Sequence, residues 1–243
     1  MNLTGAVALV TGGGSRVGRA LALALADRAA TLAVHYNASA AGAAAVVDAI
    51  AGRGGRAEAF QADLTDARAP ETLIQRVIES LGSLAVLVNS AAIMARTPFG
   101  ETSAEQWDRV VALNLRAPFL LSQAAAPHLR RAKGVIVNIA DLAAFETWPA
   151  YIPHGISKGG VVHLTRSLAK VLAPEVRVNA IAPGTVLLPA DFDPAHADHL
   201  TRTTPLQRSG SPDDVASAML FLIDAGYVTG ETIIVDGGRH VRR

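Results

Sequence analysis

The chain has 243 residues and a formal net charge of +1, with 50% hydrophobic and 18% charged residues. A chain of this length can bury a large core, and α/β folds of this size often form one domain. The composition argues against intrinsic disorder. The near-neutral charge removes the electrostatic reason to expect nucleic acid or an anionic membrane as a partner.

The absence of cysteine excludes disulfides and thiolate metal sites and favours a reducing compartment. The first residues, MNLTGAVALVTGGG, show no basic segment ahead of a long apolar stretch, so no secretory signal is expected. No apolar run reaches the roughly 18 residues of a membrane span. A close pair of histidines, His196 and His199, lacks a third ligand. We therefore expect a cytoplasmic protein with no membrane partner and no metal.

Short β-rich runs alternate with longer helical patterns along the chain. Several of the runs are continuously apolar, as strands buried on both faces are. The runs that predict strands are 6–11, 30–36, 56–63, 84–90, 134–140, 176–183 and 232–238. The helical patterns between them include 16–30, 70–82, 103–131 and 156–174. This alternation predicts a single α/β Rossmann-fold domain over residues 1–243, with a doubly wound parallel sheet of about seven strands and helices on both faces.

The least regular part of the chain is the stretch 184–214. It is too long for an ordinary connection inside a compact domain. We interpret residues 185–212, approximately, as a substrate loop or lid that contains a short helix.

The segment LVTGGGSRVGRA joins the first predicted strand to the first predicted helix. Its glycines permit a tight turn and a close backbone approach to a pyrophosphate, and the helix beyond offers free N–H groups and a positive dipole end. A glycine-rich turn also serves ordinary strand-to-helix connections. Its place at the first βα junction of a parallel sheet favours a nucleotide site.

The second predicted strand ends without an acidic residue. An acid there would bind the ribose 2′-hydroxyl of NAD and repel the 2′-phosphate of NADP. The positions are instead filled by His35, Tyr36, Asn37 and Ser39. Arg16 in the glycine-rich turn can supply a cationic partner for phosphate, or it can cap a surface or pair with an acid. We therefore expect NADPH/NADP as the cofactor.

The turn reads T-G-x-x-x-R-x-G, with Thr11, Gly12, Arg16 and Gly18. It resembles the T-G-x-x-x-G-x-G pattern of the short-chain dehydrogenase/reductase family, from which Arg16 departs. Other motifs of the family occur in the right order over essentially the whole chain. Arginine at this place, followed by HY and then Ser39 after the second strand, is most similar to the pteridine reductases.

The resemblance implies a set of nucleotide contacts. ADLTD carries two residues that meet the adenine, APGT resembles the turn that meets the nicotinamide, and NSAA stands where the family has N-N-A-G. The implied residues are Gly12, Ser15, Arg16, Val17, Gly18, His35, Tyr36, Asn37, Ser39, Asp63, Leu64, Asn89, Ala91, Lys158, Pro183, Gly184 and Val186.

The family transfers protons with an asparagine, a serine, a tyrosine and a lysine. By position these correspond to Asn114, Asp141, His154 and Lys158, so two of the four are substituted. Aspartate at the serine position is also a feature of the pteridine reductases. Each residue has a plainer alternative: Asn114 as a packing amide, Asp141 as a cap of the following turn, and Lys158 as a solvated helix lysine.

His154 lies four residues before Lys158, so both side chains share one helix face. Tyr151 does not simply replace the missing tyrosine, because two helical turns, about 10 Å, separate it from Lys158. An imidazole has an ordinary pKa near 6.5 and exchanges protons near neutral pH. We predict that an Asp141–His154 pair facing the substrate acts as the general acid.

These observations predict an NADPH-dependent oxidoreductase that transfers hydride to a C=N or C=O group of a small cyclic substrate, similar to a pteridine reductase. The alternatives are a 3-oxoacyl or ketone reductase, and an NADPH-binding protein whose turnover is impaired because a histidine replaces the tyrosine. The resemblance also implies assembly as a homotetramer or homodimer.

Overall fold

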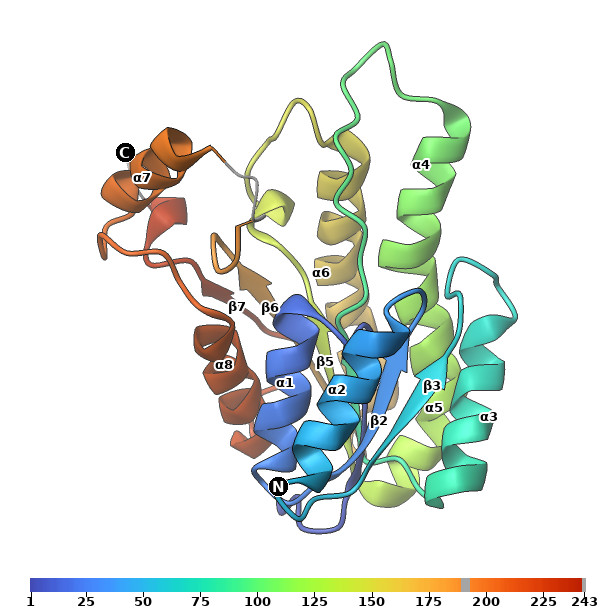
Figure 1. Ribbon diagram of the computed structural model, residues 1–243. Helices are drawn as coiled ribbons and strands as arrows, with labels where there is room; N and C mark the ends of the chain where they lie inside the picture. The colour runs from blue at the N-terminus through green and yellow to red at the C-terminus, as the bar shows by residue number, and fades with distance from the viewer. Residues whose placement is uncertain (189–192, 242–243) are drawn as a thin grey trace.

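The computed structural model describes residues 1–188 and 193–241. Part of the predicted substrate loop, 189–192, lies outside the described residues, as does the side chain of His196. One parallel sheet has the strand order β3-β2-β1-β4-β5-β6-β7 (Figure 1). The strands are β1 Val7–Val10, β2 Thr31–Tyr36, β3 Ala57–Gln61, β4 Val86–Asn89, β5 Val135–Ile139, β6 Arg177–Pro183 and β7 Thr232–Val235.

Helices cover both faces of this sheet, which confirms the predicted doubly wound Rossmann architecture (Figure 1). One face carries α1, α2 and α8, and the other carries α3, α5 and α6. The helices are α1 Arg16–Ala26, α2 Ala40–Ala51, α3 Ala69–Leu81, α4 Ala104–Val111, α5 Ala117–Ala132, α6 Ile152–Leu172, α7 Pro194–Thr203 and α8 Pro212–Asp224. Helix α7 lies in the stretch interpreted as the substrate loop.

The continuously apolar strands follow from this layering. Successive side chains of β1 point to opposite faces. Ala8 and Val10 pack in the core under α1, α2 and α8, whereas Val7 and Leu9 pack in the core under α3 and α5. A strand with a helical layer on each face has no side that can remain polar.

The chain order of the strands reverses between β1 and β4, which are neighbours in the sheet. In open α/β sheets, ligands bind in the crevice outside the carboxyl ends of the strands at such a switch point. The chain leaves β1 toward the face that carries α1 and leaves β4 toward the face that carries α5, so a crevice opens between the turns that follow these strands.

The pattern over 103–131 predicted one continuous helix, and this prediction is wrong in one respect. Helix α4 ends at Val111, and a π-helical turn, Ala112–Arg116, separates it from α5. The widened turn carries Asn114, whose side chain bonds to a distant backbone segment. Apolar periodicity does not reveal such a turn, because π-bulges are stabilised by tertiary contacts at functional sites.

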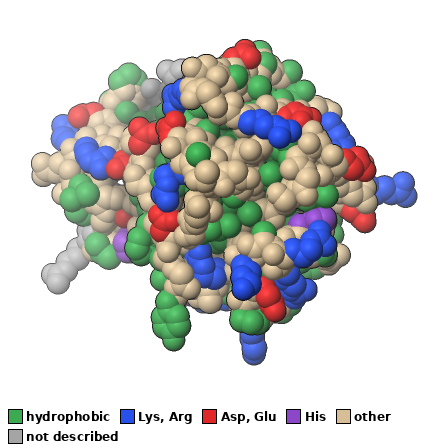
Figure 2. All heavy atoms as spheres, turned by 90° about the horizontal axis from the view of Figure 1, so that it is seen from below, with side chains coloured by type: hydrophobic (Ala, Val, Ile, Leu, Met, Phe, Trp, Pro, Cys, Tyr) green, Lys and Arg blue, Asp and Glu red, His purple; other side chains and the backbone are tan. Residues whose placement is uncertain are grey.

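Helix α6 begins at Ile152, four residues before the predicted start, and it therefore includes His154 as well as Lys158. Pro153 in its first turn suits this start, because the missing N–H would have no intrahelical partner there. Among the described residues, no helix is long and apolar enough to cross a membrane. On the face viewed from below, basic and acidic side chains are interspersed (Figure 2).

Candidate active site

The glycine-rich turn between β1 and α1 is held by His35. The Gly12 N–H donates to His35 Nδ1 at 3.1 Å, and the Gly13 N–H donates to the backbone oxygen of His35 at 2.9 Å. His35 Nε2 lies 3.1 Å from the oxygen of Ala62. Because a carbonyl oxygen only accepts, Nε2 carries the ring proton and Nδ1 accepts. Burial lowers the pKa of His35 to about 4, which keeps the ring in this neutral form at neutral pH.

Close packing surrounds the same turn. Gly12 has φ +67°, and a Cβ there would lie 3.1 Å from the Ala91 Cα. A Cβ at Gly18 would overlap the Gly12 oxygen, and a Cβ at Gly14 would lie 2.9 Å from the Ala43 nitrogen. The tight turn that the T-G-x-x-x-R-x-G pattern predicts is therefore present, and α1 begins directly beyond it.

Arg16 occupies the position at which the pattern of the resembling family has a glycine. Its φ is +49°, in the left-handed region that glycine adopts without cost. Its side chain is exposed and donates to the Leu187 oxygen at 2.8 Å. Arg16 thus lies at the rim of the nucleotide turn and also contacts the segment that follows β6. A strained residue at such a place is a signature of a functional position.

The other residues implied by the resemblance fall into two groups. Exposed side chains follow the carboxyl ends of β1, β2 and β3, at Ser15, Asn37, Ser39 and Asp63. The side chains of Leu64 and Asn89 are 2% and 4% exposed, and Asn89 donates to Asn138 at 2.8 Å. Leu64 packs in the core under α3 and α5, so only its backbone is free to face a ligand.

Thr11 joins the turns after β1 and β4. Its hydroxyl accepts the N–H groups of Ser90 and Ala91 at 2.9 and 3.1 Å. This bond holds the NSAA turn against the glycine-rich turn. After β6, the Gly184 N–H donates to Val235 at 2.9 Å, while Pro183 and Val186 are buried.

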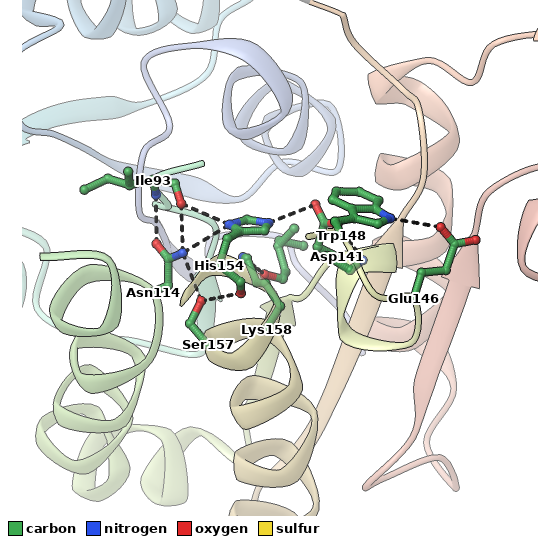
Figure 3. Close-up of polar contacts among 10 residues, drawn as sticks. Ile93, Asn114, Asp141, Glu146, Trp148, His154, Ser157 and Lys158 are labelled. Carbon is green, nitrogen blue, oxygen red and sulfur yellow. Dashed lines mark hydrogen bonds and ion pairs between the residues drawn. The ribbon is translucent and has the colours of Figure 1, made fainter. Parts of the chain in front are cut away.

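Asn114 clamps the chain just after β4 (Figure 3). Its Oδ1 accepts the Ile93 N–H at 2.8 Å, and its Nδ2 donates to the Ile93 oxygen at 2.9 Å and to Ser157 Oγ at 3.1 Å. The side chain is 1% exposed. Asn114 is therefore more than a packing amide, because it bonds both the β4 loop and α6.

His154 lies against the same clamp (Figure 3). Its Nδ1 is 3.0 Å from the Ile93 oxygen, an acceptor, so Nδ1 carries a proton. The Asn114 Nδ2 lies 3.4 Å from Nδ1, but two donors do not form a hydrogen bond. The second nitrogen, Nε2, is buried without a hydrogen-bond partner and faces Asp141 Oδ2 at 3.6 Å. The ring orientation therefore directs Nε2 at the carboxylate.

Asp141 follows β5 and has two contacts. Its Oδ1 accepts the Ala143 N–H at 2.8 Å and caps the 3₁₀ turn Leu142–Ala144. The capping role considered from the sequence is thus present, and Oδ2 is still left to face His154. The Asp141 side chain is 24% exposed, whereas that of His154 is 2% exposed. Of the two side chains, only the Asp141 carboxylate is therefore partly accessible at the surface of the site.

Lys158 lies on α6 and is 4% exposed, which excludes the solvated-lysine alternative. Its Nζ donates to the Ile139 oxygen at 2.7 Å. Burial lowers the pKa of Lys158 to about 8, and the nearby charge of Asp141 opposes that change. The two charged groups and His154 thus form one cluster at the carboxyl ends of β4 and β5.

The whole chain resembles known reductases. The family described as "Enoyl-(Acyl carrier protein) reductase" matches residues 13–240. The 3-oxoacyl-[acyl-carrier-protein] reductase FabG of Staphylococcus aureus (strain Mu50) is 36% identical over 242 residues, which cover 96% of this chain and 98% of that protein. The chain belongs to the short-chain dehydrogenase/reductase family of oxidoreductases.

Two solved structures of this family superpose on nearly all of the chain. A dehydrogenase/reductase from Sinorhizobium meliloti 1021 has a TM-score of 0.93 and 38% identity, covering 98% of this chain and 96% of that one. A blue fluorescent protein from a metagenomic library, solved in complex with NADPH, has a TM-score of 0.92 and 33% identity, covering 98% and 99%.

The geometry around His154 Nε2 has a direct chemical consequence. With Nδ1 protonated, a neutral His154 ring turns a lone pair toward Asp141, which places two acceptors opposite each other. A protonated ring turns an Nε2–H toward the carboxylate and makes a favourable contact. His154 Nε2 and the Asp141 carboxylate thus form a candidate proton-transfer pair near Lys158.

Sequence reasoning missed three contributors to this short-chain reductase site. Ser157 lies between His154 and Lys158 in the chain, and its hydroxyl donates to the His154 oxygen at 2.7 Å. Ile93 acts through its backbone, which leaves no side-chain signal in the sequence. Thr11 was part of the quoted motif, but its bonds to the NSAA turn depend on tertiary contact. No cluster of three or more potential metal ligands occurs among the described residues.

Proposed function

We propose that this protein is an NADPH-dependent carbonyl reductase of the 3-oxoacyl or ketone class. The observation that carries the proposal is the buried Asn114–His154–Lys158 arrangement, joined by Asp141, in a chain similar over its whole length to a 3-oxoacyl reductase. The sequence favoured a pteridine reductase-like activity on a cyclic substrate. The relatives support the ketone alternative better, and the pteridine activity stays a prediction based on Arg16 and Asp141.

The turn after β1 fits a dinucleotide. A Cβ at Gly14 or Gly18 would clash with neighbouring backbone, and one at Gly12 would press on Ala91, so glycine permits the compact turn on which a pyrophosphate would bind. Asn37 and Ser39 are exposed at the end of β2 without an acid, and Arg16 is exposed at the rim. This arrangement favours the 2′-phosphate of NADPH, which supplies the hydride when bound, over NAD. The solved neighbour in complex with NADPH supports the same choice.

In the proposed reaction, the His154–Asp141 pair gives its proton to the substrate oxygen. The O–H bond forms as the proton leaves the pair, while the carbonyl carbon gains the hydride and becomes a secondary alcohol. Asn114 holds the Ile93 oxygen that fixes the tautomer of His154. The Lys158 ammonium adds positive charge next to the developing oxyanion.

A second candidate is an NADPH-binding protein without turnover. The observation that favours it is the burial of His154 Nε2, which faces Asp141 and exposes no surface to a substrate oxygen. This candidate predicts tight NADPH binding with no hydride transfer. Assembly as a homotetramer or homodimer stays a prediction of the resemblance.

The test follows NADPH absorbance with an acetoacetyl thioester, cyclic ketones, a 1,2-diketone and a dihydropterin. We expect substrate-dependent oxidation with the thioester or a ketone, and its loss in His154→Ala. His163, exposed on the same helix α6, provides the control His163→Ala. Oxidation of the dihydropterin alone would restore the pteridine prediction. If titration shows that NADPH binds but no compound causes its oxidation, the result supports the candidate without turnover.

A further inference from the structure

His35 connects the two loops on which the proposed nucleotide site is built. Its ring accepts the Gly12 N–H and donates to the Ala62 oxygen, and its backbone oxygen accepts the Gly13 N–H. Gly12 belongs to the turn after β1, whereas Ala62 follows β3 and immediately precedes Asp63. One buried side chain on β2 therefore bonds both neighbours of its own strand, at the edge where a ligand would bind.

These bonds decide which way the backbone of the turn faces. The Gly12 N–H points at His35, and the Gly12 oxygen lies against Gly18, where even a Cβ would not fit. The N–H groups of two successive residues, Gly12 and Gly13, both donate to His35. The phosphate groups of a dinucleotide are therefore left to the N–H groups at the start of α1, which the turn must present at a fixed angle.

On the other side, the ring proton on Nε2 fixes the Ala62 oxygen. Asp63 then points out of the sheet and is exposed, and its carboxylate accepts the Thr65 N–H at 3.0 Å. The Ala62 N–H in turn donates to the Tyr36 oxygen at 3.0 Å. The segment 62–63 is thus tied to β2 through both its donor and its acceptor.

We infer that His35 is a positioning residue for the nucleotide: it holds the phosphate turn and the segment after β3 in register without touching the ligand. The inference rests on the proposed binding of NADPH. It replaces the direct contact that the sequence had suggested for His35, because both ring nitrogens are already bonded to the protein and the residue is 2% exposed.

The alternative is a histidine that only fills core volume. An apolar residue of similar size would then serve equally well. The positioning role and the volume-filling role can be distinguished with an apolar replacement. Such a replacement leaves the Gly12 N–H and the Ala62 oxygen without a hydrogen-bond partner, and these groups then reorient to find a new partner. Asparagine places a carbonyl oxygen near the position of Nδ1, so it can retain the acceptor for Gly12 while losing the bond to Ala62.

The experiment measures the dissociation constant of NADPH for the whole chain by fluorescence titration, alongside the thermal midpoint of the free protein. We expect His35→Leu to weaken NADPH binding by about tenfold or more. His35→Asn should lie within about threefold of the unmodified protein, because the Gly12 acceptor survives. His163→Ala, on the distant helix α6, serves as the control and should change neither quantity.

A His35→Leu protein that folds and binds NADPH as tightly as the unmodified protein would overturn the inference. If His35→Leu does not fold, His35→Gln replaces it. Glutamine can restore the donor to Ala62 but not the acceptor for Gly12, so a His35→Gln protein that binds NADPH as tightly as the unmodified protein would also overturn the inference. Failure of the unmodified protein to bind NADPH would instead overturn the proposed function, which keeps the two failures distinct.

Discussion

Two buried histidines, one on strand β2 and the other on helix α6, differ in the partners of their ring nitrogens. His35 lies at the end of β2 and His154 near the start of α6, and each is 2% exposed. Both ring nitrogens of His35 are bonded to backbone groups. In His154 only Nδ1 has such a partner, and Nε2 faces the Asp141 carboxylate at 3.6 Å.

The difference concerns what a proton would do to each ring. Burial lowers the pKa of His35 to about 4. Protonation of the ring would also place an N–H opposite the Gly12 N–H. Protonation of His154 would instead place an N–H opposite a carboxylate. The ring of His35 is fully bonded in its neutral form, whereas His154 has one unpartnered nitrogen beside an acid, which is the basis of its proposed role in proton transfer.

The largest effect is expected at the unpartnered nitrogen. His154→Ala should lower kcat for ketone reduction by about 10²–10⁴-fold, the usual contribution of a general acid. His154→Tyr, which restores the family's residue, should retain more activity than the alanine variant. Steady-state NADPH oxidation measures both. Equal kcat of His154→Ala and the unmodified protein would show that His154 does not act as the general acid.

The pH dependence of stability tests the other histidine. In the unfolded chain a histidine titrates near 6.5, while the folded pKa of His35 is about 4, so the unfolded state binds the proton first as pH falls. The contribution of His35 to the free energy of unfolding is therefore fully present above about pH 6.5 and declines below that pH. The nearby Asp63 carboxylate opposes the lowering only weakly.

Between pH 7 and pH 5 we therefore expect the unmodified protein to lose about 2 kcal/mol of unfolding free energy relative to His35→Asn. Urea unfolding of both proteins at pH 7, 6 and 5 measures the difference, and the groups common to both cancel. If the free energies of unfolding of the two proteins change equally with pH, the burial of His35 does not perturb its titration.

Asn114 tests how His154 is oriented. Asn114→Ala removes the clamp on both backbone groups of Ile93, and with it the fixed position of the oxygen that binds His154 Nδ1. We expect a loss of about 1–2 kcal/mol in stability and a fall of about tenfold in kcat with little change in KM. Chemical unfolding and steady-state kinetics are the measurements. A change confined to KM would assign Asn114 to substrate binding.

The smallest effect is expected at Arg16, on the rim of the turn that His35 holds. Arg16→Gly removes the energetic cost of a left-handed φ in a residue that has a Cβ, and it also removes the cation near the expected 2′-phosphate. The stability should rise by up to about 1 kcal/mol, while the affinity for NADPH should fall about tenfold. Binding of NADH should not change. Titration with both dinucleotides is the test, and an equal loss for both would contradict a role in phosphate recognition.

The fold could be predicted because each apolar strand and each helical pattern carries its own local signal. The π-helical turn at Asn114 could not, because tertiary contacts stabilise it. Lys158 and Asn114 were predicted as site residues by position, and the structure adds that both are buried. Ile93 contributes only backbone atoms, and no residue pattern marks that role.

By itself, the sequence determined the order of strands and helices and the glycine-rich turn, and it predicted that a histidine and an aspartate stand where the family has tyrosine and serine. These follow from side-chain size, periodicity and spacing, which are properties of the chain. Only the tertiary structure decided that His35 is enclosed with both nitrogens bonded while His154 keeps one nitrogen for Asp141. The neighbours that make this difference, Ala62 and Ile93, are distant in sequence, and the protonation of an imidazole depends on what surrounds it rather than on its place in the chain.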